Sequence, residues 1–585
     1  MKKYISIALL AGGSLFAGCS KFMDRKPVSD IAPDQFFNNE KELRVYLNSF
    51  YSAFPSAEGV YNEDIDNIVK SSMGDNITGK RTVPVTGGNW SWGELRKINF
   101  FLENYNRVMP EQQAAKFAAV AKFFRAYFYF DKVQRFGDVP WYSTTVQQKD
   151  EAALKKARDK RTLIVDSILA DIDYAIAKID NEVPSTEMVT KFTALALKSR
   201  ICLFEGTFRK YHPEMNLPGW EALLQKSVEA SEALIASGKY KIYTSTPSKA
   251  YLELFASIAP IKDEIILARN FSNELQVWHN VNYYTITSSY GKPGLEKQLV
   301  NSYLMADGSR FTDISRYDTI TFYNETQNRD PRLSQTIRTP GYSRIGTTNK
   351  LPPDFGASVT GYQLIKFVTD LSFDSFNRSI NSMPVFRYAE VLLNLAEAKA
   401  ELGAITQADL DKTIKPLRDR VGMPNMNLAA ANATPDPYLA AQYPNLSGAN
   451  KGVILEIRRE RRVELVMESY RWNDLMRWKE GKAMLRQFKG MYFPGIGQYD
   501  LDRNGKIDVH IYEGTKPSPA VSGVQYFKLG TEIDLENGAA GGNVIINRNI
   551  TKVFDETRDY LQPIPIQERL LNPNLTQNPN WNDGL

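Results

Sequence analysis

Apolar side chains recur every three or four residues in eight long segments of this chain, a spacing that is typical of amphipathic helices. The segments are residues 35–54, 94–109, 111–136, 161–179, 191–208, 220–237, 385–403 and 453–479. Most are long enough to form stable helices, and neighbouring helices could pack against each other in antiparallel pairs. The pattern therefore predicts a mainly α-helical protein.

Small residues alternate with large apolar ones in three of these segments, within residues 120–137, 192–208 and 387–403. Small side chains let neighbouring helices approach closely, as in tetratricopeptide helix pairs. The three stretches are too irregularly spaced for a regular solenoid. We therefore expect a tetratricopeptide-like helical frame that loops and other elements interrupt.

Residues 245–383 and 490–550 have a different pattern, with short apolar runs among Asn, Gly, Ser and Pro. Such composition is typical of long loops with a few short β-strands. Functional surfaces are often built on loops that a rigid frame holds in place. No Gly/Ser-rich or Pro-rich linker divides the chain, so we expect one compact unit.

The amino terminus has the order of a bacterial lipoprotein signal. Lys2 and Lys3 precede an apolar run over residues 5–16, and the small residues Ala17 and Gly18 precede Cys19. The run is shorter than a membrane-spanning helix requires. We expect residues 1–18 to be removed, Cys19 to be acylated and residues 19–30 to form a tether between the acyl chains and the body of the protein; an ordinary secretory signal is the alternative.

Charge and cysteine content exclude several classes of function. The 72 basic and 67 acidic residues nearly balance, and the densest basic run, residues 458–462, is interspersed with glutamates, which argues against nucleic-acid binding. Besides Cys19 the chain has only Cys202, which lies in an apolar helical segment and is expected to be buried. No disulfide framework is expected.

Motifs for catalysis are missing from the sequence. The chain has three histidines and neither a Gly-x-Ser-x-Gly nor a His-Glu-x-x-His motif, so it carries no signature of a serine or zinc hydrolase. Residues 74–81 approach a phosphate-binding loop, but Arg81 replaces the Ser or Thr that would hold magnesium. A pair of carboxylates at glycosidase separation stays open as an alternative.

Four glutamates at four-residue spacing form one stripe on the predicted helix 453–479, and we expect nearby arginines to neutralise them. The glutamates are Glu456, Glu460, Glu464 and Glu468, with Arg459, Arg461 and Arg471 as the expected partners. A laddered, compensated stripe is a structural feature rather than a catalytic one.

One segment has the spacing of a calcium-binding loop. Its donor positions are Asp500, Asp502, Asn504, Lys506 and Asp508, where Lys506 would contribute its backbone carbonyl. Gly505 occupies the position of the sharp turn, but Ile511 replaces the bidentate Glu at position twelve. A structural Ca²⁺ site is one interpretation, and a plain Asp/Asn/Gly turn is the other.

Two loops combine aromatic and polar side chains in the way that a glycan site needs. A sugar ring offers C–H faces to an aromatic plane and hydroxyls to polar groups. One loop contains Asp75, Arg81, Asn89 and Trp90; the other contains Trp278, His279, Tyr283, Tyr284 and Tyr290. These nine residues are the candidate ligand-binding residues, with burial in the core as the competing fate of each ring.

Several segments resemble the SusD/RagB family of nutrient-binding lipoproteins. They are residues 21–30, 125–140, 330–332, 384–393, 457–478 and 560–581, and they span essentially the whole mature chain. The resemblance implies a SusD-like fold with an N-terminal helical region over 31–240 and a C-terminal region over 241–585.

The resemblance also implies a function. Family members bind oligosaccharides without cleaving them, require no cofactor, and form a lid over a SusC-like TonB-dependent transporter on the outer surface of Bacteroidetes-type bacteria. Asp75, Arg81, Trp90 and Tyr290 occupy broadly similar places to the binding residues of the starch-binding prototype. A peptide- or protein-binding lid of the same architecture is the alternative, and a surface glycosidase is a further one.

Overall fold

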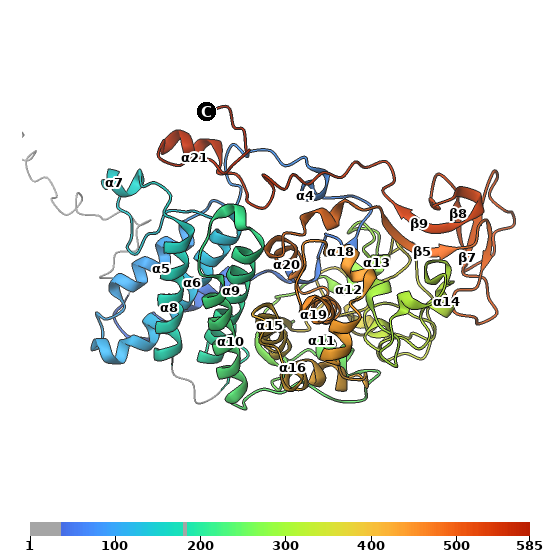
Figure 1. Ribbon diagram of the computed structural model, residues 1–585, viewed down its shortest axis with the longest axis horizontal. Coiled ribbons are helices and arrows are strands. Elements are labelled where there is room, and N and C mark those ends of the chain that lie inside the picture. Colours follow the sequence, from blue (N-terminus) through green and yellow to red (C-terminus); the bar gives the residue numbers. More distant parts are fainter. Residues whose placement is uncertain (1–36, 180–183) are drawn as a thin grey trace, which may run out of the picture.

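The computed structural model describes residues 37–179 and 184–585. The predicted signal peptide, Cys19 and the tether 19–30 lie outside the described residues. Helices gather at one end of the molecule and the longer loops and strands at the other (Figure 1). This arrangement confirms the mainly helical prediction with few short strands.

Ten helices form the frame of the described chain. They are α2 (Glu40–Asn48), α5 (Gly93–Asn104), α6 (Glu111–Phe136), α8 (Arg161–Lys178), α9 (Lys191–Tyr211), α10 (Trp220–Ala236), α15 (Tyr388–Glu401), α16 (Gln407–Asp419), α19 (Lys451–Glu464) and α20 (Arg471–Arg477). Helix α16 is the one long helix that the apolar spacing did not predict; a capping box at Thr406 and Asp409 begins it.

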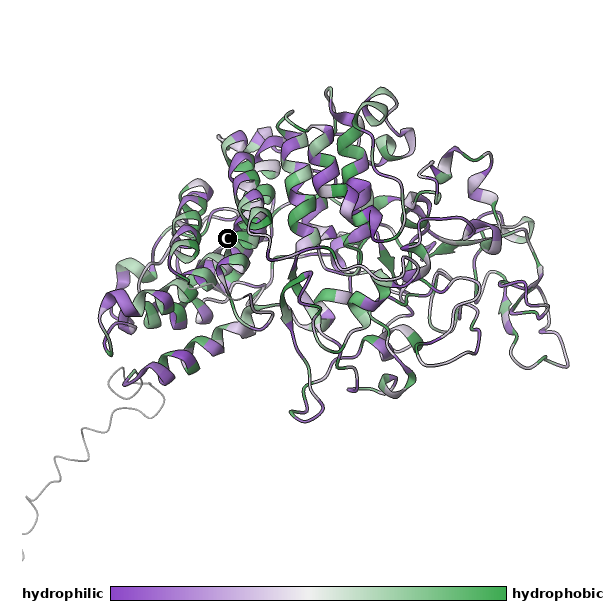
Figure 2. Cartoon of the chain, turned by 90° about the horizontal axis from the view of Figure 1, so that it is seen from below, coloured by the Kyte–Doolittle hydropathy of each residue, from purple (hydrophilic) through white to green (hydrophobic). Residues whose placement is uncertain are grey.

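Successive frame helices pack side by side, so that α6 contacts α5 and α8, α8 contacts α9, and α9 and α10 contact each other and α15. Hydrophobic and hydrophilic residues are interleaved along these helices, as their amphipathic spacing predicts (Figure 2). Small residues make the close approaches: a Cβ at Gly206 of α9 would lie 2.8 Å from the Leu224 side chain of α10. Cys202 is buried in this core.

Shorter helices occur throughout the remaining chain. They are α3 (Ala57–Tyr61), α4 (Asp75–Thr78), α7 (Glu151–Leu154), α11 (Ala250–Ala256), α12 (Val281–Ile286), α13 (Lys297–Ser302), α14 (Phe322–Glu325), α17 (Leu428–Ala433), α18 (Pro437–Gln442) and α21 (Ile566–Leu571). None of the helices in the described ranges is both long and apolar enough to cross a membrane.

The strands of the described residues form four small sheets. Antiparallel pairs join β1 (Ile68–Val69) to β3 (Gly294–Leu295), β2 (Ile265–Arg269) to β4 (Met383–Arg387), and β5 (Phe488–Phe493) to β9 (Gly542–Ile546). The fourth sheet places β7 (Val509–Tyr512) between antiparallel β6 (Gly497–Tyr499) and parallel β8 (Gln525–Lys528). A second hydrophobic core lies beneath these elements, beside the core of the helical frame.

Two predicted helices have different bounds in the structure. The segment 385–403 begins as strand β4, which pairs with β2, and becomes helical only at Tyr388. The segment 453–479 breaks after Glu464, where Met467 and Ser469 adopt positive φ angles of 62° and 64°. The buried Glu63 carboxylate accepts hydrogen bonds from the backbone N–H groups of Met467 and Arg471 at this break.

The glutamate stripe is buried rather than solvent-exposed, and most of its partners are distant in sequence. Of the predicted pairs, only Glu456 with Arg459 is present, at 3.1 Å. The other partners come from separate elements: Glu460 pairs with Arg332 and Arg418, Glu464 with Arg332, Arg387 and Arg420, and Glu468 with Lys366 and Arg387. The stripe is therefore the centre of a buried ion network, which agrees with its structural interpretation.

Candidate functional site: an aromatic surface on the loop end

Helix α12, the turn that follows it and the segment around residue 376 carry a cluster of accessible aromatic rings. Tyr283 and Tyr290 are half-buried, and their ring centroids are 6.1 Å apart in an edge-to-face arrangement. Phe376 is 57% exposed and lies 5.6 Å from Tyr283. Such an accessible aromatic cluster offers the apolar faces on which a ring with C–H bonds can stack.

The segment with Phe376 is fixed against α12 by hydrogen bonds. The Asn377 backbone N–H donates to the Asn280 side-chain oxygen at 2.6 Å, and the Asn280 amide donates to the Asn377 side-chain oxygen at 3.1 Å. His279 and Ser379 form a backbone bridge beside them. The position of Phe376 is therefore set by the fold, because these contacts leave the segment little freedom.

Trp278 lies beside the segment that carries Phe376, in a polar setting. Its indole N–H donates to Asn273 Oδ1 at 2.7 Å, and the Arg378 guanidinium lies 5.9 Å from the ring centroid. Leu275 nearby is 77% exposed. We define the aromatic surface as Trp278, Tyr283, Tyr290 and Phe376.

Polar groups adjoin the aromatic surface on the side of Tyr290. The Ser71 backbone N–H donates to the Gly291 carbonyl at 2.8 Å, which brings the segment before the first predicted loop against the end of the second. A cavity of about 350 Å³ opens there, lined in part by Ser71, Lys292, Glu532 and Asn547. Ser71, which precedes the first predicted loop, therefore lies against the end of the second loop, where stacking and hydrogen-bonding groups are both present.

Three of the predicted glycan residues are buried in the core. Trp90 packs edge-on against Phe136 at 4.8 Å. Tyr284 is fully buried, and its hydroxyl donates to Asn62. Burial lowers the pKa of His279 to about 4, and its Nε2 bonds the Asn381 carbonyl at 3.0 Å. These side chains stabilise the fold and have no surface on which a ligand could stack. Trp90, Tyr284 and His279 are therefore core residues and not part of the candidate glycan site.

The remaining residues of the first loop are separated from the aromatic surface by their contacts. Arg81 is held at the C-terminal segment by an ion pair with Asp559 at 2.9 Å and lies over the ring of Trp581, so its role is structural. Asn89 is exposed and lines a different cavity, beside α6. Asp75 is exposed at the start of α4, and within the described chain its carboxylate has no partner.

The calcium-like loop brings three carboxylates together. Ligand oxygens of Asp500, Asp502 and Asp508 lie within 4.8 Å of one another. Burial, with the nearby charges of Asp502 and Asp500, raises the pKa of Asp508 to about 6. Gly505 has φ 84°, as the sharp turn of such a loop requires. The position-twelve residue, Ile511, is buried in β7 and offers no carboxylate.

Comparisons with known proteins agree with this architecture. A model described as the SusD family matches residues 263–581, and a second, described as "Starch-binding associating with outer membrane", matches residues 59–195. SusD-like protein P38 of Formosa agariphila is 23% identical over 537 residues, which cover 84% of this chain and 95% of the relative.

Solved structures show the same fold. A SusD-like protein of Bacteroides fragilis aligns with a TM-score of 0.67 at 20% identity, covering 95% of this chain and all of that one. A laminarin-binding SusD-like protein aligns with a TM-score of 0.53 at 18% identity, covering 93% of this chain and all of that one. The chain belongs to the SusD family.

Proposed function

We propose that this protein is a lipid-anchored, non-enzymatic cell-surface protein that binds an oligosaccharide and delivers it to a SusC-like TonB-dependent transporter in the outer membrane. The observation that carries the binding role is the aromatic surface beside polar loop groups. It supplies both kinds of contact that a sugar requires. The family membership supports the association with the outer membrane, and the Cys19 motif supports acylation there.

Titration against a panel of neutral oligosaccharides tests the binding role. Tyr283→Ala should weaken binding of the best ligand about ten-fold or more, which corresponds to ~1.4 kcal/mol, because it removes the ring that contacts both Tyr290 and Phe376. Tyr526→Ala is the matched control, since Tyr526 is also half-buried but lies on β8.

The panel also separates the alternatives. Binding of a tryptic-peptide mixture with no response to any glycan would favour the peptide-binding lid of the same architecture. Release of shorter products from a bound glycan on overnight incubation would favour a surface glycosidase. Unchanged chromatograms with retained binding support the non-enzymatic role.

We also propose a structural Ca²⁺ in the loop 500–508. The three clustered carboxylates, the Asn504 side chain and the Lys506 carbonyl are hard oxygen donors of the kind that Ca²⁺ prefers. The ion would neutralise the carboxylates and fix the connection between β6 and β7. Lack of a twelfth-position carboxylate predicts weak binding.

A further inference from the structure

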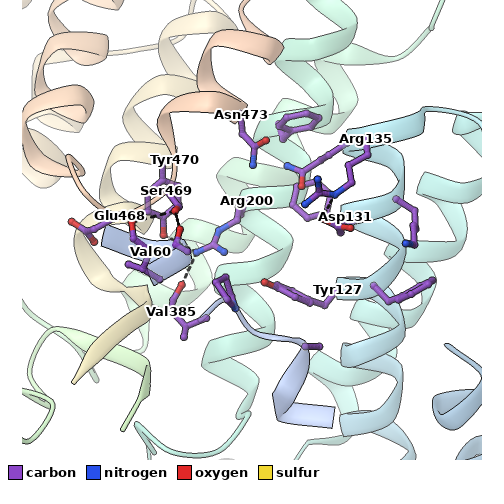
Figure 3. Close-up of a pocket in the computed structure, with 18 of the residues that line it drawn as sticks. Val60, Tyr127, Asp131, Arg135, Arg200, Val385, Glu468, Ser469, Tyr470 and Asn473 are labelled. Atoms are coloured by element: carbon purple, nitrogen blue, oxygen red, sulfur yellow. Dashed lines mark hydrogen bonds and ion pairs between the residues drawn. The ribbon is translucent and has the colours of Figure 1, made fainter. Parts of the chain in front are cut away.

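A cavity of about 640 Å³ lies between α6, α9 and the turn that joins α19 to α20 (Figure 3). Helix α3 separates it from the aromatic surface, since Gly59 and Val60 line the cavity while Tyr61 contacts Tyr284 on the other side. Side chains that decide its chemistry are Tyr127, Asp131, Arg135, Arg200 and Asn473. The cavity is therefore a second place at which a ligand could bind.

Arg200 presents a fixed hydrogen-bond donor to this cavity. Its Nε and Nη2 atoms donate to the two oxygens of Glu390 at 2.6 and 2.7 Å, and Nη2 also donates to Val385 O and the Tyr470 hydroxyl. Phe386 lies under the guanidinium at 4.0 Å. Nη1 has no partner in the described chain, although the rest of the guanidinium group is held rigidly. The Nη1 edge of Arg200 is therefore a preorganised hydrogen-bond donor that a ligand could use.

The wall opposite carries further unpaired groups from α6 and α20. Arg135 uses only Nε, which donates to Asp131 at 2.8 Å, and both of its outer nitrogens are without partners in the described chain. The Tyr127 hydroxyl and the Asn473 amide likewise make no hydrogen bond to any described residue. Figure 3 shows Tyr127 and Arg200 directed toward the same space.

Tyr127, Asp131, Arg135 and Arg200 all line this cavity. Burial raises the pKa of Tyr127 to about 12, and the charges of Arg200, Asp131 and Arg135 all act on the same hydroxyl. Each arginine pairs one edge with a carboxylate, so its unpaired edge can donate to the carboxylate of a ligand without breaking that ion pair.

We propose that this cavity binds an acidic sugar unit, with the carboxylate on Nη1 of Arg200, Arg135 adding positive charge beside it, and ring hydroxyls bonded to Tyr127, Asn473 and the free oxygen of Asp131. A neutral sugar could offer these guanidinium edges only uncharged oxygens, which accept weaker hydrogen bonds than the charge-assisted bonds that a carboxylate accepts. The inference rests on the proposed glycan-binding role and assigns a second site and a ligand class to it.

Calorimetric titration with matched ligands tests this site. The ligands are uronate trimers built from galacturonate, glucuronate or mannuronate, each compared with its methyl-esterified counterpart, which has the same rings without the charge. At least one acid should bind ten-fold or more tightly than its ester. Arg135→Gln and Tyr127→Phe should each reduce that affinity about five-fold or more, because the first removes a positive charge and the second a hydroxyl. Both side chains are half-buried, and each replacement preserves most of the shape, so the fold should be retained.

Tyr283→Ala separates this inference from the proposed function. It should leave the acid affinity unchanged while it weakens binding of neutral glycans. Acids that bind no better than their esters, or an acid affinity that survives both cavity substitutions, would overturn the acidic-sugar site and leave the aromatic surface standing. Acid binding lost in the cavity variants, with no response to any neutral glycan, would support the cavity and contradict the aromatic surface.

Discussion

Replacing Asp66 with Asn should destabilise this protein strongly, because Asp66 neutralises a buried group of arginines. Its carboxylate accepts hydrogen bonds from Nε and Nη2 of Arg471 at 2.7 Å each, and it lies 3.2 Å from Arg462 and 3.5 Å from Arg486. Burial alone would raise the pKa of Asp66, but the charges of Arg471 and Arg462 outweigh it and hold that pKa well below its usual range.

The magnitude follows from what the substitution leaves behind. Asn keeps the shape and one acceptor but removes the negative charge, while Arg471 and Arg462 stay buried. Removing one partner of a buried ion pair lowers the free energy of unfolding by about 3–5 kcal/mol. The Asp66 contacts also tie the N-terminal loop to α19 and α20, so the loss should affect unfolding of the whole chain rather than of one loop.

Urea denaturation followed by tryptophan fluorescence measures this effect. The matched control is Asp173→Asn, since Asp173 pairs with Lys198 at 2.6 Å but is half-exposed, and exposed pairs typically contribute ~0.2–1 kcal/mol. Equal free energies of unfolding for the two variants would refute the reasoning, because the buried network would then contribute no more than a surface pair.

Three further predictions concern protonation, metal binding and the anchor. Burial lowers the pKa of His279 to about 4, below its unfolded value of about 6.5. The stability that depends on the neutral His279 is therefore fully present above pH 6.5 and is lost as the pH falls toward 4. At pH 5 the loss of folding free energy amounts to ~2 kcal/mol. His279→Gln should reduce the loss of stability between pH 7 and pH 5 by that amount, and an unchanged pH profile would contradict it. Millimolar Ca²⁺ should raise the melting temperature of the protein but not of Asp508→Asn, and equal shifts would argue against the loop site. Cys19→Ala should abolish membrane retention in cell fractionation without changing glycan affinity, whereas weakened binding by the soluble variant would show that the anchor does more than hold the protein.

Local sequence patterns were sufficient to predict most helices of the frame. Helix α6 has the predicted bounds, because Pro110 precedes it and Gly137, with φ 71°, ends it. The break after Glu464 could not be predicted, since the Glu63 carboxylate that stabilises it lies about 400 residues away in the chain. The ion network around the glutamate stripe had no local signal for the same reason.

The candidate site shows a similar division between local and long-range information. The second predicted loop contains three of the four rings of the aromatic surface, but the four residues named for the first loop lie elsewhere, and residue type alone could not separate accessible rings from buried ones. Tyr283 and Tyr284 are neighbours on α12, and consecutive helical positions face about 100° apart, so one ring is accessible and the other is in the core. Phe376 was missed because only the pairing of its segment with α12 brings it to the surface.

A crystal structure with a bound neutral oligosaccharide tests the central claim most directly. The ligand would be the tightest binder of the glycan panel. The account predicts a sugar ring stacked on Tyr283, Tyr290 or Phe376, with hydroxyls bonded toward Ser71 and Lys292. A ligand bound elsewhere on the chain, with the aromatic surface unoccupied at saturating concentration, would contradict it.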